Sequence, residues 1–233
     1  RKEIDIIGFL RRRFYRIFPP LVFMILIAVP FTLFIRKDFV ANIGTQIAGA
    51  LGFVTNFYEL LSGGSYESQF IPHLFVHTWS LALEVHYYIL WGLAVWFLAK
   101  KSRSLGQFRG SIFLISTGIF LLSFLSMFVS SFLTKNFSSL YFSSWTHIFP
   151  FFAGTALATV SGVQHIGANF KKQVRTWTLQ QTLGMVAGGF SVLLVLGFLL
   201  RFDNIFTYLI GFLIATISAL AMILGARILH EKT

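Results

Sequence analysis

The sequence contains no cysteine among its 233 residues. Disulfide bonds, thiolate nucleophiles and thiolate metal ligands are therefore excluded. Charge is also scarce, because Asp, Glu, Lys and Arg together make up 12% of the chain, whereas a soluble domain usually has about 25%. This composition excludes an ordinary soluble globular domain.

Several catalytic signatures are also missing. The chain has no GxSxG nucleophile motif, no Walker A loop, no glycine-rich dinucleotide fingerprint and no HExxH zinc motif. His73 and His77 have the i, i+4 spacing of helical metal ligands, but His73 follows Pro72 in an expected loop. We therefore predict no metal site.

Hydrophobic residues dominate what is present, since they form 56% of the chain and the mean hydropathy is +0.76. A transmembrane helix needs about 20 apolar residues. Residues 43–58 form a shorter, more polar run. The pattern predicts an all-α polytopic membrane protein with about six transmembrane helices plus one re-entrant or weak segment. Nearly uncharged runs of spanning length occupy residues 17–35, 80–99, 111–134, 145–163, 181–200 and 205–226.

The formal net charge of +11 would suggest nucleic acid binding in a soluble protein. Here the basic residues lie between hydrophobic runs, as they do in the cytoplasmic loops of membrane proteins. We therefore predict the lipid bilayer as a partner and no nucleic acid. Lys and Arg number six in residues 1–16, four in 100–110 and three in 164–180. The positive-inside rule puts these segments in the cytoplasm.

These assignments conflict if all seven segments cross the bilayer, because both ends could not then be cytoplasmic. We interpret 43–58 as re-entrant or interfacial on the outer side, with the proline-containing run 17–35 as the alternative. The basic run RRRFYR at 11–16 then lies at the inner end. A polar set lies at the outer end: His73, His77, Ser80, Glu84, His86 and His147.

The stretch HTWSLALEVHYY at residues 77–88 places polar side chains in a hydrophobic segment. Ser80, Glu84 and Tyr88 recur every four residues and therefore share one face of a helix. A charged glutamate inside a bilayer costs at least ~2.5–3.5 kcal/mol, so such a residue indicates a functional site. The role that we expect for Glu84 is that of a proton acceptor or donor. The alternative is a buried glutamate that pins helices together through hydrogen bonds.

A later stretch, SSWTHIFPFFAGTALA at 143–158, places His147 at the outer mouth of the next span. His147 is either a site residue or an interfacial hydrogen-bonding residue. Gly154 and Ala158 have the small-xxx-small spacing that is typical of close helix packing.

The run LRRRFYRIFPP places Arg13 and Arg16 three residues apart, on one helical face. Two guanidinium groups on one face suit a diphosphate, because arginine binds phosphate oxygens in a bidentate manner. The alternative is a topology anchor or a site for anionic lipid.

Together these motifs resemble those of the membrane acyltransferase-3 family. IDIIGFLRRRFYRIFPPL is followed about 60 residues later by HTWSLALEVHYYILW, similar to the family's basic FxxRRxxRIxP and HTWSLAxExxFY motifs. The stretch SSLYFSSWTHIFPFFAGTALA is most similar to the branch of Gram-positive peptidoglycan O-acetyltransferases. The motifs cover roughly residues 3–160, and the remainder resembles the family only in hydropathy.

The resemblance implies an enzyme of the bacterial plasma membrane. It implies transfer of an acetyl group from cytoplasmic acetyl-CoA to an extracytoplasmic sugar hydroxyl, with muramic acid in a cell-wall polysaccharide as the favoured acceptor. Arg13 and Arg16 match the RxxR pair that is thought to contact the CoA phosphates. Ser80 and Glu84 match the SxxxE motif, Tyr88 matches the aromatic that follows it, and His147 lies near a polar motif of this branch.

The chain also departs from the family. Family members have spans before the basic motif, the first with a catalytic Arg and His, and later spans with a SYxxYLxH stretch. This branch often adds a fused or separate extracellular SGNH hydrolase-like domain. None of these features lies in residues 1–233, and His86 stands where the family usually has Gln. We therefore expect residues 1–233 to be a single transmembrane acyltransferase domain fragment, inactive alone.

Two other functions compete with acyl transfer. In a proton-coupled transporter of a small anionic or lipid-linked solute, Glu84 would be the coupling site, although no inverted repeat is visible. In a non-catalytic scaffold, Glu84 would only stabilise the fold. The sequence leaves open the acceptor sugar, a covalent acyl intermediate on Tyr88 and the oligomeric state.

Overall fold

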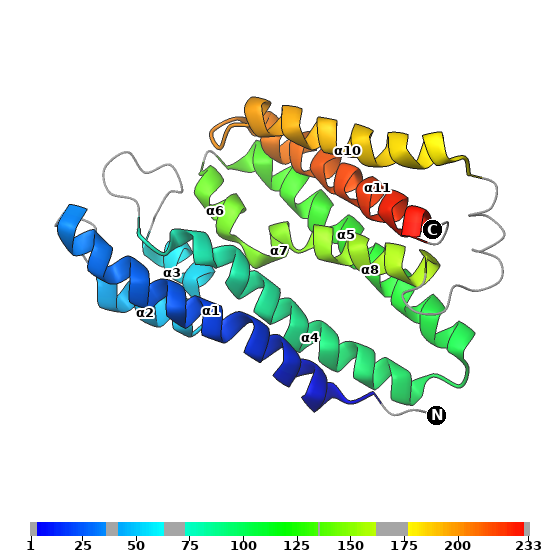
Figure 1. Ribbon diagram of the computed structural model, residues 1–233, viewed down its shortest axis with the longest axis horizontal. Helices are drawn as coiled ribbons and strands as arrows, with labels where there is room; N and C mark the ends of the chain where they lie inside the picture. The colour runs from blue at the N-terminus through cyan, green and yellow to red at the C-terminus, as the bar shows by residue number, and fades with distance from the viewer. Residues whose placement is uncertain (1–3, 36–41, 63–72, 135, 162–176, 231–233) are drawn as a thin grey trace. The chain divides into compact units, whose positions relative to one another are not determined.

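The computed structural model describes residues 4–35, 42–62, 73–134, 136–161 and 177–230 (Figure 1). Every regular element in these ranges is helical, which confirms the all-α prediction. The chain divides into two compact units, and each is described by itself. The first comprises Arg1–Arg103 with Asn136–Ser144, and the second comprises Ser104–Lys135 with Trp145–Thr233.

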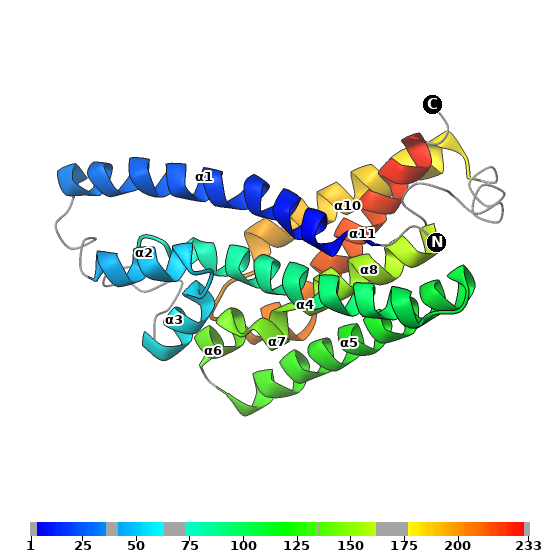
Figure 2. The ribbon, with the colours of Figure 1, turned by 90° about the horizontal axis from the view of Figure 1, so that it is seen from below.

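Two long helices, α1 (Ile6–Ile35) and α4 (Trp79–Lys101), run side by side in the first unit (Figure 1, Figure 2). The two helices are antiparallel, because Gly92 late in α4 lies against Ile6 and Phe9 at the start of α1. A Cβ at position 92 would lie 3.1 Å from Cδ1 of Ile6, so glycine permits this close approach.

Helix α1 begins well before the hydrophobic run that the sequence suggested. The carboxylate of Asp5 accepts a 2.8 Å hydrogen bond from the backbone N–H of Gly8 and so satisfies one free donor of the first turn. The arginines of RRRFYR therefore belong to the helix, and its prolines at 19, 20 and 30 do not end it.

Residues 43–58 fold into parts of two short helices, α2 (Ile43–Leu51) and α3 (Thr55–Ser62), separated by a turn in which Phe53 has a φ of 54°. Helices of 9 and 8 residues are about 12–14 Å long at 1.5 Å per residue, too short for a hydrocarbon core of about 30 Å. They pack near the C-terminal half of α1 and the start of α4, where Leu21 and Ile25 meet Ala50 and Phe75.

The chain reaches α4 through one short turn of helix, η2 (Val76–Thr78), and the first unit is completed by α6 (Phe137–Phe142). Helix α6 packs against α3, and its last residues contact Trp79 at the start of α4. The beginning of α4 is therefore enclosed by short helices, whereas its second half is accompanied by α1.

The second unit contains α5 (Leu105–Leu133), α8 (Phe149–Ser161), α10 (Leu179–Leu199), η3 (Thr207–Gly211) and α11 (Phe212–His230). Helix α7 (Ser144–His147) begins at the last residue of the first unit. Glycines bring α10 and α11 together, because a Cβ at Gly189 would lie 2.8 Å from the carbonyl oxygen of Ser218. At Gly154, by contrast, a Cβ would meet no described atom within 4 Å, so the expected close packing is absent there.

Five helices in the described part of the chain are long and apolar enough to cross a membrane. They overlap five of the six predicted spans. The predicted span 145–163 is instead divided between α7 and the 13-residue α8, and residues 162–176 lie outside the described residues. The polytopic prediction is confirmed, and this segment differs because the helix is broken between His147 and Phe149. The candidate spans are Ile6–Thr32, Val76–Lys101, Leu105–Leu133, Leu179–Leu199 and Thr207–His230.

Candidate functional site

Glu84 and Tyr88 contact each other on α4. They lie one turn apart, and the Tyr88 hydroxyl donates a 2.5 Å hydrogen bond to Oε1 of Glu84. Both side chains are half-buried. Within a helix long enough to span the bilayer, this bond partly compensates the carboxylate for the loss of water.

Arg13 reaches Tyr88 from α1. Its guanidinium carbon lies 5.0 Å from the centre of the Tyr88 ring and 5.4 Å from that of Phe9. The ring of Phe9 stands edge-on to Tyr88, with 6.0 Å between centroids. The cation thus stacks on two aromatic faces, which is favourable by about 0.5–2 kcal/mol. Arginine, tyrosine and glutamate form one connected set across the α1–α4 pair.

A cavity of about 460 Å³ lies beside this set, between the start of α1 and the second half of α4. Its wall is largely apolar and includes the aromatic side chains of Phe9, Tyr88 and Trp91, with Asp5 and Arg12 as charged members. This volume is within the usual range of about 300–1,000 Å³ for small-molecule sites. The cavity lies toward the basic ends of both helices, since Lys100 and Lys101 close α4.

The predicted arginine pair is only partly brought together by the structure. Arg13 is half-buried against Tyr88, whereas Arg16 is exposed one turn further along α1. The arginine that lines the cavity is Arg12, which sequence reasoning did not single out. A three-residue spacing placed Arg13 and Arg16 on one face, but only the partner helix decided which guanidinium is covered.

Ser80 makes a local hydrogen bond, and His147 is described with the second unit. Ser80 is exposed, and its hydroxyl donates backward to the carbonyl of His77 at 3.3 Å. His147 belongs to the second unit, where it is buried with its ring 4.9 Å from that of Phe212. The carbonyl of His77 in η2, three residues before Ser80, is within reach of the hydroxyl, which explains its orientation.

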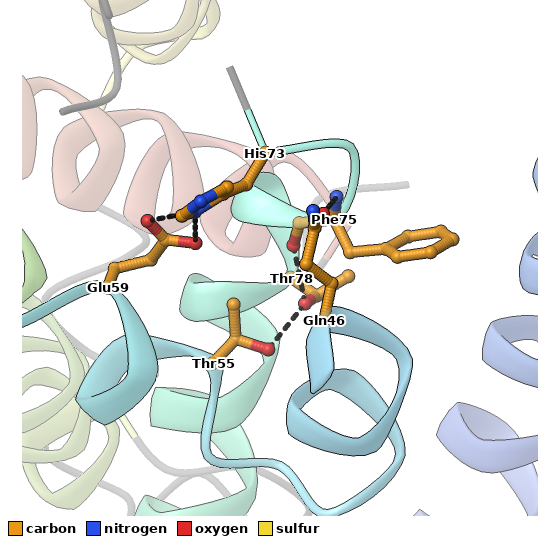
Figure 3. Close-up of polar contacts among 6 residues, drawn as sticks. All are labelled: Gln46, Thr55, Glu59, His73, Phe75 and Thr78. Atoms are coloured by element: carbon orange, nitrogen blue, oxygen red, sulfur yellow. Dashed lines mark hydrogen bonds and ion pairs between the residues drawn. The ribbon is translucent and has the colours of Figure 1, made fainter. Parts of the chain in front are cut away.

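A second polar cluster was missed by sequence reasoning (Figure 3). Nδ1 of His73 lies 2.8 Å from Oε1 and 2.9 Å from Oε2 of Glu59 on α3. Glu59 is only 2% exposed. Burial raises the pKa of the Glu59 carboxyl above its ordinary value, while the hydrogen bond and the charge of His73 act in the opposite direction.

Further hydrogen bonds hold the elements around this pair. The Thr55 and Thr78 hydroxyls share a 2.8 Å hydrogen bond that joins α3 to η2, and Thr78 donates to the carbonyl of Phe75 (Figure 3). The side-chain oxygen of Gln46 accepts a 3.4 Å hydrogen bond from the backbone of Phe75. Asn56 on α3 donates to the Ser144 hydroxyl at 2.7 Å.

One sequence signal could have revealed this cluster. Glu59 is the only charged residue between 43 and 66. Thr55 and Asn56 precede it by four and three residues and therefore share its helical face. Its partner His73 could not be found in the same way, because the pairing depends on how α3 folds against η2.

Metal ligands are not gathered in the described part of the chain. Among these residues, no three His, Asp or Glu side chains are grouped so that they could hold a metal ion. The pair of Glu59 and His73 supplies only two ligand side chains, fewer than the three or four that a zinc site uses.

Comparisons with known proteins show what the chain is related to. Over 225 residues, 95% of its length, it is 27% identical to the O-acetyltransferase OatA of Staphylococcus aureus strain NCTC 8325. Over its whole length it is 25% identical to a second protein, from S. aureus strain COL, that is provisionally named as an O-acetyltransferase. No family model matches the chain, and no solved structure matches it significantly.

The resemblance to membrane O-acetyltransferases is thus confirmed as homology. The chain is a multi-pass protein of the bacterial cell membrane and a homologue of OatA. It spans about a third of the length of these relatives, 35% of the first and 38% of the second.

Proposed function

We propose that this protein is an O-acetyltransferase that moves an acetyl group from cytoplasmic acetyl-CoA across the membrane to an extracytoplasmic sugar hydroxyl. The acceptor that we propose is muramic acid in peptidoglycan, a modification that confers lysozyme resistance. The observation that carries the proposal is the connected set of Arg13, Tyr88 and Glu84 in a homologue of O-acetyltransferases. It joins a cation near the basic helix ends to a carboxylate inside a membrane-spanning helix.

The features beside Tyr88 fit the chemistry of acetyl-CoA. A pantetheine arm is long and largely apolar, and the cavity of about 460 Å³ has a largely apolar wall. Phosphate groups need cations, which Arg12, Arg13 and Arg16 supply near this end of α1. We assign phosphate binding to Arg13 and Arg16, as the motif implies, and add Arg12 because it lines the cavity.

Glu84 is the proposed proton acceptor. Its Oε1 already accepts the hydrogen bond of the Tyr88 hydroxyl, so a proton can pass between these two oxygens without a rearrangement of the helix. Arg13, stacked on the Tyr88 ring, places positive charge beside any negative charge that develops on the tyrosine oxygen. Ser80 and His147 are further proposed site residues because of the motifs that they match.

The proposal also covers the domain that holds the site and its extracellular partner. We propose that residues 1–233 act as one transmembrane acyltransferase domain that is inactive without the rest of the enzyme. A fused or separate extracellular SGNH hydrolase-like domain is a further proposed partner, beside the cell-wall polysaccharide.

The test supplies isotope-labelled acetyl-CoA to membranes from cells that express the full-length protein in which residues 1–233 lie, and labelled O-acetyl groups on muropeptides are quantified. We expect label with the wild type and its loss with Glu84→Gln at equal expression. A matched control is Gln107→Glu, which alters a polar side chain at the first turn of α5. Persisting label in Glu84→Gln would reduce Glu84 to a structural role, and no label from folded wild type would overturn acetyl transfer to peptidoglycan in favour of transport.

A further inference from the structure

The Glu59–His73 pair has the geometry of an imidazole base held by a carboxylate. Both oxygens of Glu59 lie within 2.9 Å of Nδ1 of His73. When Glu59 is ionised it can only accept, so the neutral ring then has its proton on Nδ1 and its lone pair on Nε2. The Glu59 side chain is 1% exposed and that of His73 is 24% exposed. The carboxylate therefore lies behind the imidazole, which is the accessible member.

The positive-inside rule puts the pair at the end of the first unit that faces away from the cytoplasm. The arginines at 11–13 lie near the start of α1, and α4 ends with Lys100 and Lys101. Because the two helices are antiparallel, their basic ends coincide and mark the cytoplasmic side. Helix α3 and the lead into η2 lie at the opposite ends of these helices, where an extracytoplasmic acceptor arrives.

The surroundings hold the pair in place. The hydrogen bond between Thr55 and Thr78 fixes α3 against η2 (Figure 3), and the ring of Tyr58 lies 5.2 Å from that of His73. Asn56, which is fully buried three residues before Glu59, has a side-chain oxygen without a hydrogen-bond partner among the described residues. A buried acceptor of this kind calls for a donor, which a bound hydroxyl or a water would supply.

We propose that His73, positioned by Glu59, is a catalytic base for the acceptor hydroxyl. The inference rests on the proposed function and adds a residue to it. Nε2 of His73 takes the proton of the sugar hydroxyl as the sugar oxygen bonds to the acetyl carbonyl carbon. The bond from that carbon to the atom that carries the acetyl group breaks; this atom is the thioester sulfur of acetyl-CoA or the oxygen of an acyl intermediate. It leaves with the electron pair and receives the proton from Nε2. One ester is formed, and the imidazole returns to its neutral state.

Glu59 is a positioning residue in this scheme. It fixes the tautomer of His73 and stabilises the imidazolium while the proton is held. The other titratable groups on the elements packed around the pair are Tyr58 of α3, His77 of η2, Tyr141 of α6, and Glu84, His86, Tyr87, Tyr88, Lys100 and Lys101 of α4.

The decisive variant is His73→Asn in the full-length protein. The amide nitrogen of asparagine can replace Nδ1 as the donor to Glu59, but nothing replaces Nε2. We expect labelled acetyl transfer to fall by about 10²–10⁴-fold, with kcat reduced more than the KM for acetyl-CoA is raised. The thermal unfolding midpoint should stay near that of the wild type. His86→Gln is the matched control, because His86 stacks on Phe57 at 5.6 Å and is outside the pair.

Glu59→Gln distinguishes a role of Glu59 in catalysis from a purely structural contact with His73. The amide keeps a hydrogen bond to His73 but removes the negative charge, so the acid limb of the rate–pH profile should move to lower pH. If the Glu59–His73 contact only fixes α3 in place, Glu59→Gln should leave the rate–pH profile unchanged. An unchanged profile would overturn the inference even if His73→Asn fails to fold. Full activity in folded His73→Asn overturns it as well. Absence of label from the wild type overturns the proposed function and this inference with it.

Discussion

The hydroxyl of Tyr88 donates a 2.5 Å hydrogen bond to Oε1 of Glu84, and the guanidinium of Arg13 lies 5.0 Å from the centre of the Tyr88 ring. The tyrosine is therefore the link between a cation on α1 and a carboxylate on α4. Its hydroxyl and its ring make different contacts, so the two can be tested separately.

Tyr88→Phe should remove the hydrogen bond to Glu84 while it keeps the ring against Arg13 and Phe9. We expect acetyl transfer to fall by about 10²-fold or more, since proton transfer by a positioned group contributes on this scale. Labelled O-acetyl groups on muropeptides measure the effect. Tyr15→Phe, at a residue that is 65% exposed, is the control and should behave as the wild type. Equal activity of both variants would remove the Tyr88 hydroxyl from the mechanism.

Arg13→Lys should keep the positive charge but lose the guanidinium contacts with the rings of Tyr88 and Phe9. We expect the KM for acetyl-CoA to rise about three- to tenfold, in line with a lost contact of about 1 kcal/mol, and the membrane topology to stay unchanged. Arg11→Lys, at an exposed neighbour, should leave the KM unaltered. If both variants leave it unaltered, Arg13 serves as a topology anchor and not as a donor-binding residue.

Gly189→Ala should loosen the packing of α10 against α11. The new Cβ would lie 2.6 Å from Cγ of Met222 and 2.8 Å from the carbonyl oxygen of Ser218, so the helix backbones must separate at a cost of about 1–3 kcal/mol. Gly188→Ala is the adjacent control, because its Cβ meets no described atom within 4 Å. Thermal unfolding in detergent should show a lower midpoint for Gly189→Ala alone, and similar midpoints for both would contradict the packing.

Glu59 should make the stability of the protein depend on pH. Burial raises the pKa of Glu59 in the folded chain above the ordinary value of 4.5, so between 4.5 and the raised value the folded state binds more protons than the unfolded state. The free energy of unfolding therefore increases as the pH falls through this window. Above the window, the cost of the buried charge is fully present.

Unfolding midpoints measured in detergent from pH 8 to pH 4.5 test this dependence. Glu59→Gln should remove the rise in this window, because the amide does not titrate. Asp203→Asn, which alters an exposed carboxylate, should retain it. A rise of the same size in Glu59→Gln would assign the dependence to another group.

Much of the fold followed from hydrophobic run length. Five of the six predicted spans became long helices, because about 20 apolar residues have few alternatives to a helix in a bilayer. The start of α1 could not be predicted in this way, since its first turns are basic and amphipathic. The break between α7 and α8 was also missed, because the run 145–163 stays apolar across it.

The sequence by itself determined the membrane class, the basic ends of α1 and α4 and the Glu84–Tyr88 contact, because all of these depend on composition or on spacing within one helix. Only the tertiary structure decided that Arg13 covers Tyr88, that Arg12 lines the cavity and that Glu59 meets His73. These contacts join residues on different helices. Their partners are chosen by how the helices pack, and a single sequence contains no local pattern that specifies that choice.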